Sequence, residues 1–255
     1  MQAHTSNHTS GIRYQSPGTI HVDLNRDRRR RQRHATDEDV VRRFTPGRIP
    51  TVIRTLGSER FARLVDILGA CTGLLLFAPA LLLAILAIRL TSPGPTFYAQ
   101  IRVGIGGRLF KMYKLRTMVT GADRQQSQLQ KYNEISGPAF KMRHDPRITP
   151  VGRVLRKFSI DEVPQFLNVL RGDMSLVGPR PPLPREVKKY QRWHLQRLMV
   201  KPGLTGLWQV SGRNRLNFDE WVRLDIRYIR QRSLWLDLKI MLKTFKVVFI
   251  RPDGA

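Results

Sequence analysis

The stretch from Ile67 to Ile88 reads ILGACTGLLLFAPALLLAILAI, and it decides the fold. It holds 22 consecutive residues without a charged side chain, which is enough for a helix to cross the hydrocarbon core of a bilayer. A long polar segment precedes it, so this run is not a cleaved signal peptide. The run therefore predicts attachment to a membrane, and its simplest interpretation is a single spanning helix.

Pro79 and the flanking charges favour a different arrangement of this run. A proline in the interior of a helix breaks or kinks it. Of the 45 Lys and Arg residues, 13 precede Leu64 and 32 follow Ile88. Basic residues beside a membrane segment tend to stay in the cytoplasm, and here both flanks are strongly basic. We therefore predict that residues 59–90 form a re-entrant helix, bent at Pro79, that enters and leaves by one membrane face.

The composition limits the kinds of partner and metal site. A net charge of +26 over 255 residues predicts polyanionic partners, namely nucleic acid, anionic lipid headgroups or phosphorylated substrates. A single cysteine, Cys71, excludes a disulfide framework and a cysteine-based metal site. Among the six histidines only His4 and His8 are four residues apart, in a polar segment without helical periodicity. We therefore predict no zinc site.

Residues 1–58 are polar and carry the run RDRRRRQRH from Arg26 to His34. They show no hydrophobic periodicity, so we interpret them as a disordered basic tail. The arginines are compatible with a solvated tail, with binding to anionic lipids, or with binding to nucleic acid. The nucleic-acid alternative is the weakest, because no aromatic residues are interleaved with the arginines.

Residues 91–255 are expected to form a cytosolic catalytic domain. Phe97–Val103 and Leu109–Leu115 have the composition of two strands, and the glycines between them favour a hairpin turn over a phosphate-binding loop. Residues 185–199 and 235–250 have helical spacing of apolar residues with Lys and Arg around them. Each is either a surface helix packed on the core or an amphipathic helix lying in the membrane interface.

These features predict the α/β fold class. We expect a compact, helix-rich cytosolic domain with a small β-hairpin, anchored by an N-terminal re-entrant membrane helix and by interfacial amphipathic helices.

The candidate site lies in KFSIDEVPQFLNVLRGDMSLVGPRPP, from Lys157 to Pro182. Ser159 and Glu162 have capping-box spacing, so Asp161 and Glu162 are predicted at the start of a helix that stops at Gly172. Most acidic residues at helix starts are only caps. The neighbouring Arg156, Lys157 and Arg180 make a second interpretation necessary.

Phosphoryl transfer is that second interpretation. A carboxylate can attack phosphorus and form an acyl phosphate, and the adjacent Asp161 and Glu162 could also hold Mg²⁺. Arg180 stands in GPRPP, where the flanking prolines restrict the backbone, and a guanidinium suits two-point contact with phosphate. A rigid surface turn without a partner is the alternative for Arg180.

Several long motifs resemble the bacterial sugar transferases, specifically the small monotopic polyprenyl-phosphate glycosyl-1-phosphate transferases. They are SPGPTFYAQIRVGIGGRLFKMYKLRTM, DPRITPVGRVLRKFSIDEVPQFLNVLRGDMSLVGPRPP, KPGLTGLWQVSGR and LDIRYIRQRSLWLDLKIMLKTFKVV. With the apolar run they cover most of residues 61–250. Their number and their order along the chain make the resemblance specific. The family's membrane element is a re-entrant helix broken at a Ser-Pro, and here Ala78 stands in place of the serine.

The resemblance implies a role for each site residue. Asp161 corresponds to the nucleophile of the family's Asp-Glu dyad, and Glu162 to the residue associated with Mg²⁺. Arg180 corresponds to the arginine of the Pro-Arg-Pro motif, which contacts phosphate. Arg156 corresponds to an arginine near the nucleotide, and Asp237 to the acidic residue of the C-terminal LDLK motif.

The resemblance also implies a reaction and a location. Sugar-1-phosphate would pass from a UDP-sugar to undecaprenyl phosphate through a covalent aspartyl intermediate, with release of UMP. The protein would lie on the cytosolic face of the bacterial inner membrane and start exopolysaccharide, capsule or O-antigen synthesis. The expected partners include anionic membrane lipids and a second copy of the chain, but not nucleic acid. The alternatives are a membrane-bound glycosyltransferase that releases UDP and a membrane-tethered protein that binds nucleic acid.

Overall fold

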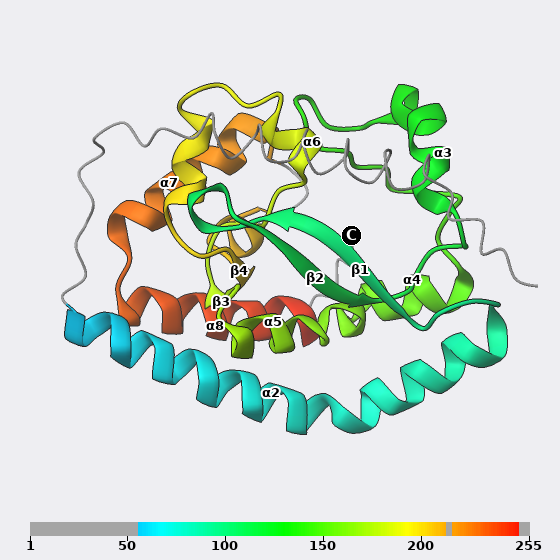
Figure 1. Ribbon diagram of the computed structural model, residues 1–255, viewed down its shortest axis with the longest axis horizontal. Coiled ribbons are helices and arrows are strands. Elements are labelled where there is room, and N and C mark those ends of the chain that lie inside the picture. Colours follow the sequence, from blue (N-terminus) through cyan, green and yellow to red (C-terminus); the bar gives the residue numbers. More distant parts are fainter. Residues whose placement is uncertain (1–55, 213–215, 250–255) are drawn as a thin grey trace, which may run out of the picture. The chain divides into compact units, whose positions relative to one another are not determined.

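The computed structural model describes residues 56–212 and 216–249 (Figure 1). The predicted basic tail, residues 1–58, falls almost entirely outside these ranges. Helix α2, Leu56–Thr91, is the longest described element, with 36 residues. Within the described ranges it is also the one helix whose length and composition would let it cross a membrane. The sequence-based prediction of a membrane-attached helix over residues 59–90 is consistent with it.

Helix α2 continues through Pro79, so the helix does not end at this proline, and its re-entrant course stays a prediction. Figure 1 shows a bowed helix, with the other labelled elements on its concave side. A proline removes one backbone hydrogen bond, and a long helix absorbs that loss by bending when its two halves are held in place. The packing of the two halves supplies this restraint.

Close glycine contacts fix the N-terminal half of α2. A Cβ atom added at Gly69 would come within 2.5 Å of Leu176 Cδ1, and one added at Gly73 would come within 2.5 Å of the Phe166 ring. These glycines are four residues apart and therefore lie on one helix face. The lack of a side chain at both positions lets the helix lie directly on the domain.

The polar Asp66, which lies on the same helix, is buried. Its Oδ1 atom accepts hydrogen bonds of 2.9 Å from the Ser175 hydroxyl and from the Leu176 backbone N–H. A buried carboxylate needs such partners, because leaving its hydrogen bonds unmade is costly. Asp66 therefore ties the N-terminal half of α2 to the short strand β3, Ser175–Val177.

The C-terminal half of α2 packs on the same domain. Ala84 and Ile88 are buried in one hydrophobic cluster with Leu115 and Leu155. Between the charged residues at its two ends, most of the remaining helix surface is apolar, and its large exposed apolar residues are Phe61, Leu64, Ile67, Leu68, Leu75, Leu76, Leu82, Leu83, Leu86 and Leu90. One face of α2 thus covers the domain along both halves, while the remaining surface suits hydrocarbon.

The predicted hairpin is confirmed with the same bounds. Strand β1, Phe97–Val103, pairs antiparallel with strand β2, Leu109–Leu115. The connection contains the short 3₁₀ turn η1, Ile105–Gly107, in which Gly106 has a φ of 61°. Glycine is favoured there because a Cβ atom makes positive φ costly. The glycine cluster forms a turn, as predicted.

Strand β1 turns apolar side chains outward and polar side chains inward, the reverse of the usual arrangement in a sheet that covers a core. The apolar Phe97 and Ile101 are exposed, whereas Tyr98, Gln100 and Arg102 alternate with them on the inner face. Side chains alternate across a strand, so the three polar residues share one side. This side faces the cavity described below.

The remaining elements are short helices, 3₁₀ turns and one further strand. They are α3 (Ala122–Leu129), η2 (Gln130–Tyr132), α4 (Pro150–Lys157), η3 (Ile160–Glu162), α5 (Gln165–Arg171), α6 (Pro184–Val187), η4 (His194–Met199), β4 (Gly203–Thr205), η5 (Trp208–Val210), α7 (Phe218–Gln231) and α8 (Leu234–Phe249).

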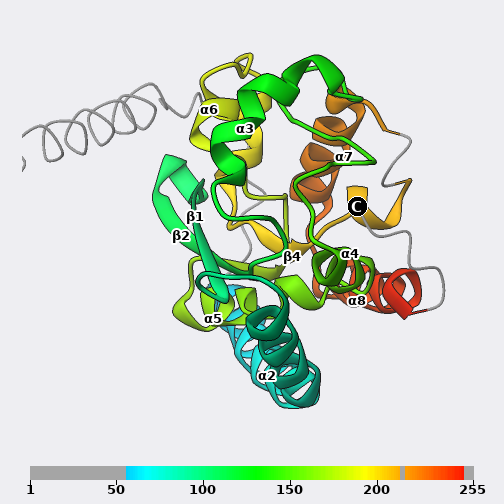
Figure 2. The same cartoon turned by 90° about the vertical axis from the view of Figure 1, so that its right-hand side faces the viewer.

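These elements lie at two different distances from α2. Figures 1 and 2 show α4, α5 and α8 next to α2, and α3, α6 and α7 on the far side. The largest hydrophobic cluster joins α2, the hairpin, α5, β3, α7 and α8. The short strand β3, which belongs to this cluster, pairs in parallel with β4, and this pairing was not predicted from the sequence.

The helix predicted over residues 185–199 is wrong, and the one over 235–250 is confirmed as α8. Only α6 and the 3₁₀ turn η4 form in the first region. Val187 and Leu198 lie in one buried cluster with Val103, so this region packs inward and does not form an interfacial helix. In α8 the large exposed apolar residues are Leu234, Trp235, Leu238, Leu242 and Phe245.

Candidate active site

The Asp161–Glu162 pair does not cap a helix, which corrects the predicted capping box. It lies in the 3₁₀ turn η3, and helix α5 begins only at Gln165, after Pro164. Within the described residues Ser159 makes no side-chain cap hydrogen bond, and its φ is 56°. A serine in this left-handed region is strained, and such strain concentrates at functional sites. The predicted helix stop at Gly172 is confirmed, with a φ of 86°.

The turn η3 places Asp161 on the wall of a cavity of about 500 Å³. Asp161 is only 5% exposed. The Lys114 ammonium of strand β2 lies 3.9 Å from Asp161 Oδ2 and 2.6 Å from Glu162 Oε1. One lysine therefore faces both carboxylates, and it neutralises part of their charge.

The buried position changes the acidity of Asp161. Burial raises the pKa of Asp161 to about 6, and the adjacent Glu162 carboxylate also raises this pKa. The positive charges of Lys114 and Arg156 lower it in part. Desolvation disfavours the charged form of a carboxylic acid. Asp161 is thus a poorly solvated carboxylate that is still ionised at neutral pH, which suits a nucleophile.

The structure brings the predicted Arg156 and Arg180 to the same cavity as the acidic pair. Arg156, near the end of helix α4, donates from Nε to the Thr117 hydroxyl at 2.9 Å. Arg180 follows strand β3, and its Nη1 lies 3.3 Å from a Glu186 carboxylate oxygen. The two guanidiniums and Lys114 make the cavity a place for anions, and guanidinium groups bind phosphate especially well.

Sequence reasoning missed the contribution of the hairpin to this cavity. Lys114 of β2 lines it together with Tyr98, Gln100 and Arg102 of β1. The sequence signal was incomplete: Lys114 is two residues from the apolar Met112 and shares its side of the strand, but alternation alone does not say which side faces inward. A lysine on the inner face of a strand is unusual unless it is paired.

Two carboxylates are available for a divalent cation at this site. Mg²⁺ is commonly held by one or two protein carboxylates together with waters and substrate phosphates. Asp161 and Glu162 are adjacent and face the cavity, so this donor set fits Mg²⁺ once phosphate oxygens complete the coordination. Within the described ranges, no group of three or more Asp, Glu, His or Cys side chains is placed so that it could hold a metal ion. The pair alone would therefore depend on substrate for tight binding.

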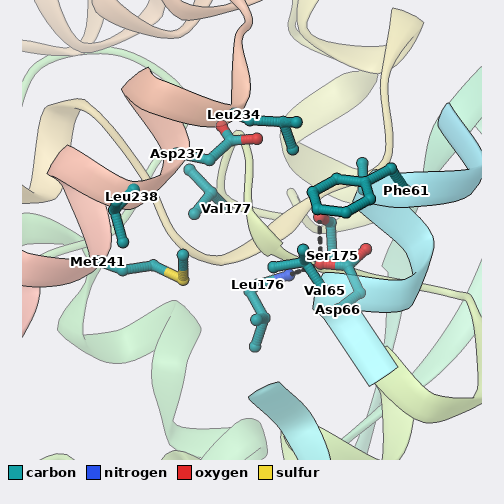
Figure 3. Close-up of a pocket in the computed structure, with 11 residues that line it drawn as sticks. Phe61, Val65, Asp66, Ser175, Leu176, Val177, Leu234, Asp237, Leu238 and Met241 are labelled. Carbon is teal, nitrogen blue, oxygen red and sulfur yellow. Dashed lines mark hydrogen bonds between the residues drawn. The ribbon is translucent and has the colours of Figure 1, made fainter. Parts of the chain in front are cut away.

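Asp237 does not join this site. It lies at the start of α8 and lines a separate, mainly apolar pocket between α2, β3 and α8 (Figure 3). Its carboxylate accepts a 2.7 Å hydrogen bond from the hydroxyl of Tyr228, which is buried in the core. Asp237 is not among the residues lining the cavity of Asp161, and its predicted substrate-binding role stays a prediction.

Fold and site together define a class of protein. An apolar helix suited to a membrane lies against a domain whose cavity holds an acidic pair among lysine and arginine side chains, as a transferase of phosphorylated substrates requires. The sequence profile of the bacterial sugar transferases matches residues 57–251. The chain belongs to this family.

Three relatives show how similar other members are. The undecaprenyl-phosphate galactose phosphotransferase of Salmonella typhimurium is 45% identical over 204 residues, which cover 78% of this chain and 42% of the relative. The UDP-glucose:undecaprenyl-phosphate glucose-1-phosphate transferase of Caulobacter vibrioides is 47% identical over 192 residues, 71% of this chain and 67% of the relative. The exopolysaccharide production protein ExoY of Rhizobium meliloti is 42% identical over 193 residues, 73% of this chain and 84% of the relative.

The relatives differ in how much of their length this chain spans. The chain covers less than half of the Salmonella protein, and the same holds for the galactosyl transferase CpsE of Streptococcus agalactiae.

Proposed function

We propose that this protein transfers sugar-1-phosphate from a UDP-sugar to undecaprenyl phosphate and releases UMP, at the start of exopolysaccharide, capsule or O-antigen synthesis. The observation that carries the proposal is the burial of Asp161, as a non-capping carboxylate, on the wall of a cationic cavity. The relatives support the substrate class, since two of them are named for phosphotransfer to undecaprenyl phosphate and one for exopolysaccharide production.

In the first step an Asp161 carboxylate oxygen attacks the phosphorus that carries the sugar. A new bond forms between this oxygen and phosphorus, and the bond from phosphorus to the bridging oxygen of the diphosphate breaks. UMP leaves with that oxygen and its electron pair. Because the ionised carboxylate has no proton to lose, no base is required, and Lys114, Arg156 and Arg180 balance the charge on the phosphate oxygens.

In the second step a phosphate oxygen of undecaprenyl phosphate attacks the same phosphorus. The bond to Asp161 breaks, the carboxylate is regenerated, and the sugar and the lipid become joined through a diphosphate. Mg²⁺ held by Glu162 and Asp161 would supply positive charge to the substrate phosphates. Glu162 and Lys114 keep the Asp161 side chain oriented toward the cavity through their mutual contacts.

The proposed location is the cytosolic face of the bacterial inner membrane. The exposed apolar surface of α2 would enter the bilayer and return, because both halves of the helix are packed on one domain. The exposed apolar residues of α8, next to Lys239, Lys243 and Lys246, would lie in the interface. Anionic lipids are proposed partners of the basic chain, and a second copy stays a prediction.

Product analysis with the purified full-length chain tests this function. UDP-sugars are supplied singly with undecaprenyl phosphate and Mg²⁺, and the nucleotide product is separated and measured. We expect UMP with at least one sugar. Release of UDP would mean attack at the sugar carbon and would contradict the proposal. Absence of turnover together with tight, strongly salt-dependent binding to DNA or RNA would support the nucleic-acid alternative.

A further inference from the structure

The Pro179–Pro182 segment is held in an unusual way, through its carbonyl groups. Its three prolines have no N–H groups to donate, so the segment depends mainly on donors from elsewhere that bond to its carbonyls. Its four successive carbonyls accept from Gly203 N, Arg197 Nη2, Arg102 Nη1 and Val103 N, at 2.9, 3.4, 2.8 and 2.9 Å. The backbone that carries the Arg180 side chain is therefore fixed along its whole length.

The Arg180 side chain has its own anchor in Glu186. One oxygen of Glu186, Oε2, accepts from Arg180 Nη1 at 3.3 Å and from the Leu183 backbone N–H at 2.8 Å. Glu186 is only 3% exposed, whereas the Arg180 side chain is 30% exposed and lines the cavity. The buried partner thus presents a guanidinium that substrate can reach.

Glu186 also compensates a second buried charge. Arg102 is buried and lines the same cavity. Burial acts to raise the pKa of Glu186, but Arg180 and Arg102 together hold it below its usual value. The carboxylate is therefore ionised at neutral pH. Its negative charge reduces the repulsion between the Arg180 and Arg102 guanidiniums, which otherwise only a bound phosphate would offset.

A simple cap is the alternative role for Glu186, and Glu220 shows what such a cap looks like. Glu220 is the third residue of α7 and accepts from Asn217 N at 2.9 Å, just as Glu186 accepts from Leu183 N. Glu220 is exposed and faces solvent, while Glu186 is buried against Arg180. The capping bond is common to both residues, and the arginine contact distinguishes Glu186.

We propose that Glu186 is a positioning residue, which directs the Arg180 guanidinium into the cavity and allows Arg180 and Arg102 to bind a phosphate together. The inference rests on the proposed function, in which the cavity receives the donor diphosphate and the acceptor phosphate. Glu186 acts through Arg180 and does not touch the substrate.

A double-mutant cycle on the full-length chain separates this role from a structural one. The dissociation constant for UDP is measured by calorimetry in the wild type, Glu186→Gln, Arg180→Gln and the double variant. Glutamine keeps the shape and the bond to Leu183 N but loses the charge. We expect Glu186→Gln to weaken UDP binding about 10- to 100-fold in the wild type, as for loss of a charge-assisted hydrogen bond. In the Arg180→Gln background the same change should cost less than about threefold.

The matched control is Glu220→Gln, which should change UDP affinity and thermal unfolding little. The KM for undecaprenyl phosphate is measured in the same four proteins, because Arg180 could serve the acceptor phosphate. Coupling in either measurement supports the proposal and shows which phosphate Arg180 binds. Equal losses in both backgrounds, or no loss from Glu186→Gln, would overturn it. If Glu186→Gln does not fold, the cycle is run with Glu186→Asp, which keeps the charge and shortens its reach.

UMP release by the wild type is recorded separately and tests the proposed function. If the wild type binds UDP but makes no UMP, the function fails and the cycle still decides the role of Glu186. If it neither binds UDP nor makes UMP, both are wrong.

Discussion

Asp161 shows how local backbone geometry decides what a carboxylate does. At the start of a regular helix its side chain would accept backbone N–H bonds, and the pKa would fall. The left-handed Ser159 and the turn η3 place it in a buried position facing Lys114, where burial outweighs one backbone hydrogen bond and raises its pKa to about 6. A substitution that restores ordinary solvation would therefore lower this pKa.

The acidity of Asp161 predicts a pH profile for the reaction. Only the ionised carboxylate attacks, so kcat/KM for the UDP-sugar should rise about tenfold per pH unit below a midpoint near pH 6 and level off above it. Lys114 lowers the pKa of Asp161, so Lys114→Gln should move the midpoint to higher pH. The control is Lys111→Gln, on the exposed side of the same strand. A midpoint that stays in place in Lys114→Gln would show that the lysine does not act on Asp161.

At the scale of the element, the contact between α2 and α5 depends on the absence of a side chain. The Phe166 ring of α5 occupies the space that a Cβ atom at Gly73 would need. Forcing a larger residue into such a contact displaces the ring or the helix.

Gly73→Val should therefore destabilise the protein by about 1–3 kcal/mol, the usual range for overpacking. The measurement is urea unfolding in detergent micelles, followed by the fluorescence of the four tryptophans. Thr72→Val is the matched control, because Thr72 is exposed on the same helix and valine has nearly the same shape. Equal stability of the two variants would mean that α2 does not lie against Phe166.

The elements differ in how well the sequence predicted them, for physical reasons. The hairpin was predictable to the residue because its strands are bounded by glycines that can adopt positive φ. Residues 185–199 have helical spacing, yet tertiary contacts decide their structure: Val187 and Leu198 pack on Val103 without a continuous helix. The spacing of apolar residues along the chain does not show where tertiary contacts will prevent a continuous helix.

The candidate site was predictable in part. Arg156, Asp161 and Arg180 were expected together and line one cavity. Lys114 was missed because period-2 alternation does not say which face of a hairpin is inner, and in β1 the polar face turns inward. Asp237 was assigned by resemblance alone, and the fold places it in a different pocket.

At the scale of the whole molecule, the packing of α2 bears on membrane topology. A helix of 36 residues is about 54 Å long at 1.5 Å per residue, more than enough to span a bilayer. Yet Ala70 in its first half and Ile88 near its end are both buried against the same domain. A spanning helix would have to leave one of these contacts, so the packing favours entry and exit by one face.

This topology predicts the labelling of engineered cysteines in intact cells. With Cys71 replaced by serine, single cysteines at Ser16 and Ser233 should both resist a membrane-impermeant thiol reagent and should react after the cells are permeabilised. Labelling at position 16 alone would indicate a spanning helix. Pro79→Leu should shift the protein toward that state, because leucine favours a straighter helix.

Acceptor-free labelling tests the central claim, that Asp161 is a covalent nucleophile, most directly. The purified chain is mixed with a UDP-sugar that supports turnover and that carries a radiolabel in its sugar. No lipid acceptor is present. The account predicts a burst of about one equivalent of UMP and a labelled protein, and neither in Asp161→Asn, because an amide is a poor nucleophile. Turnover with acceptor should also fall by several orders of magnitude in this variant. If stably folded Asp161→Asn keeps the burst and near-normal turnover, the covalent mechanism is wrong.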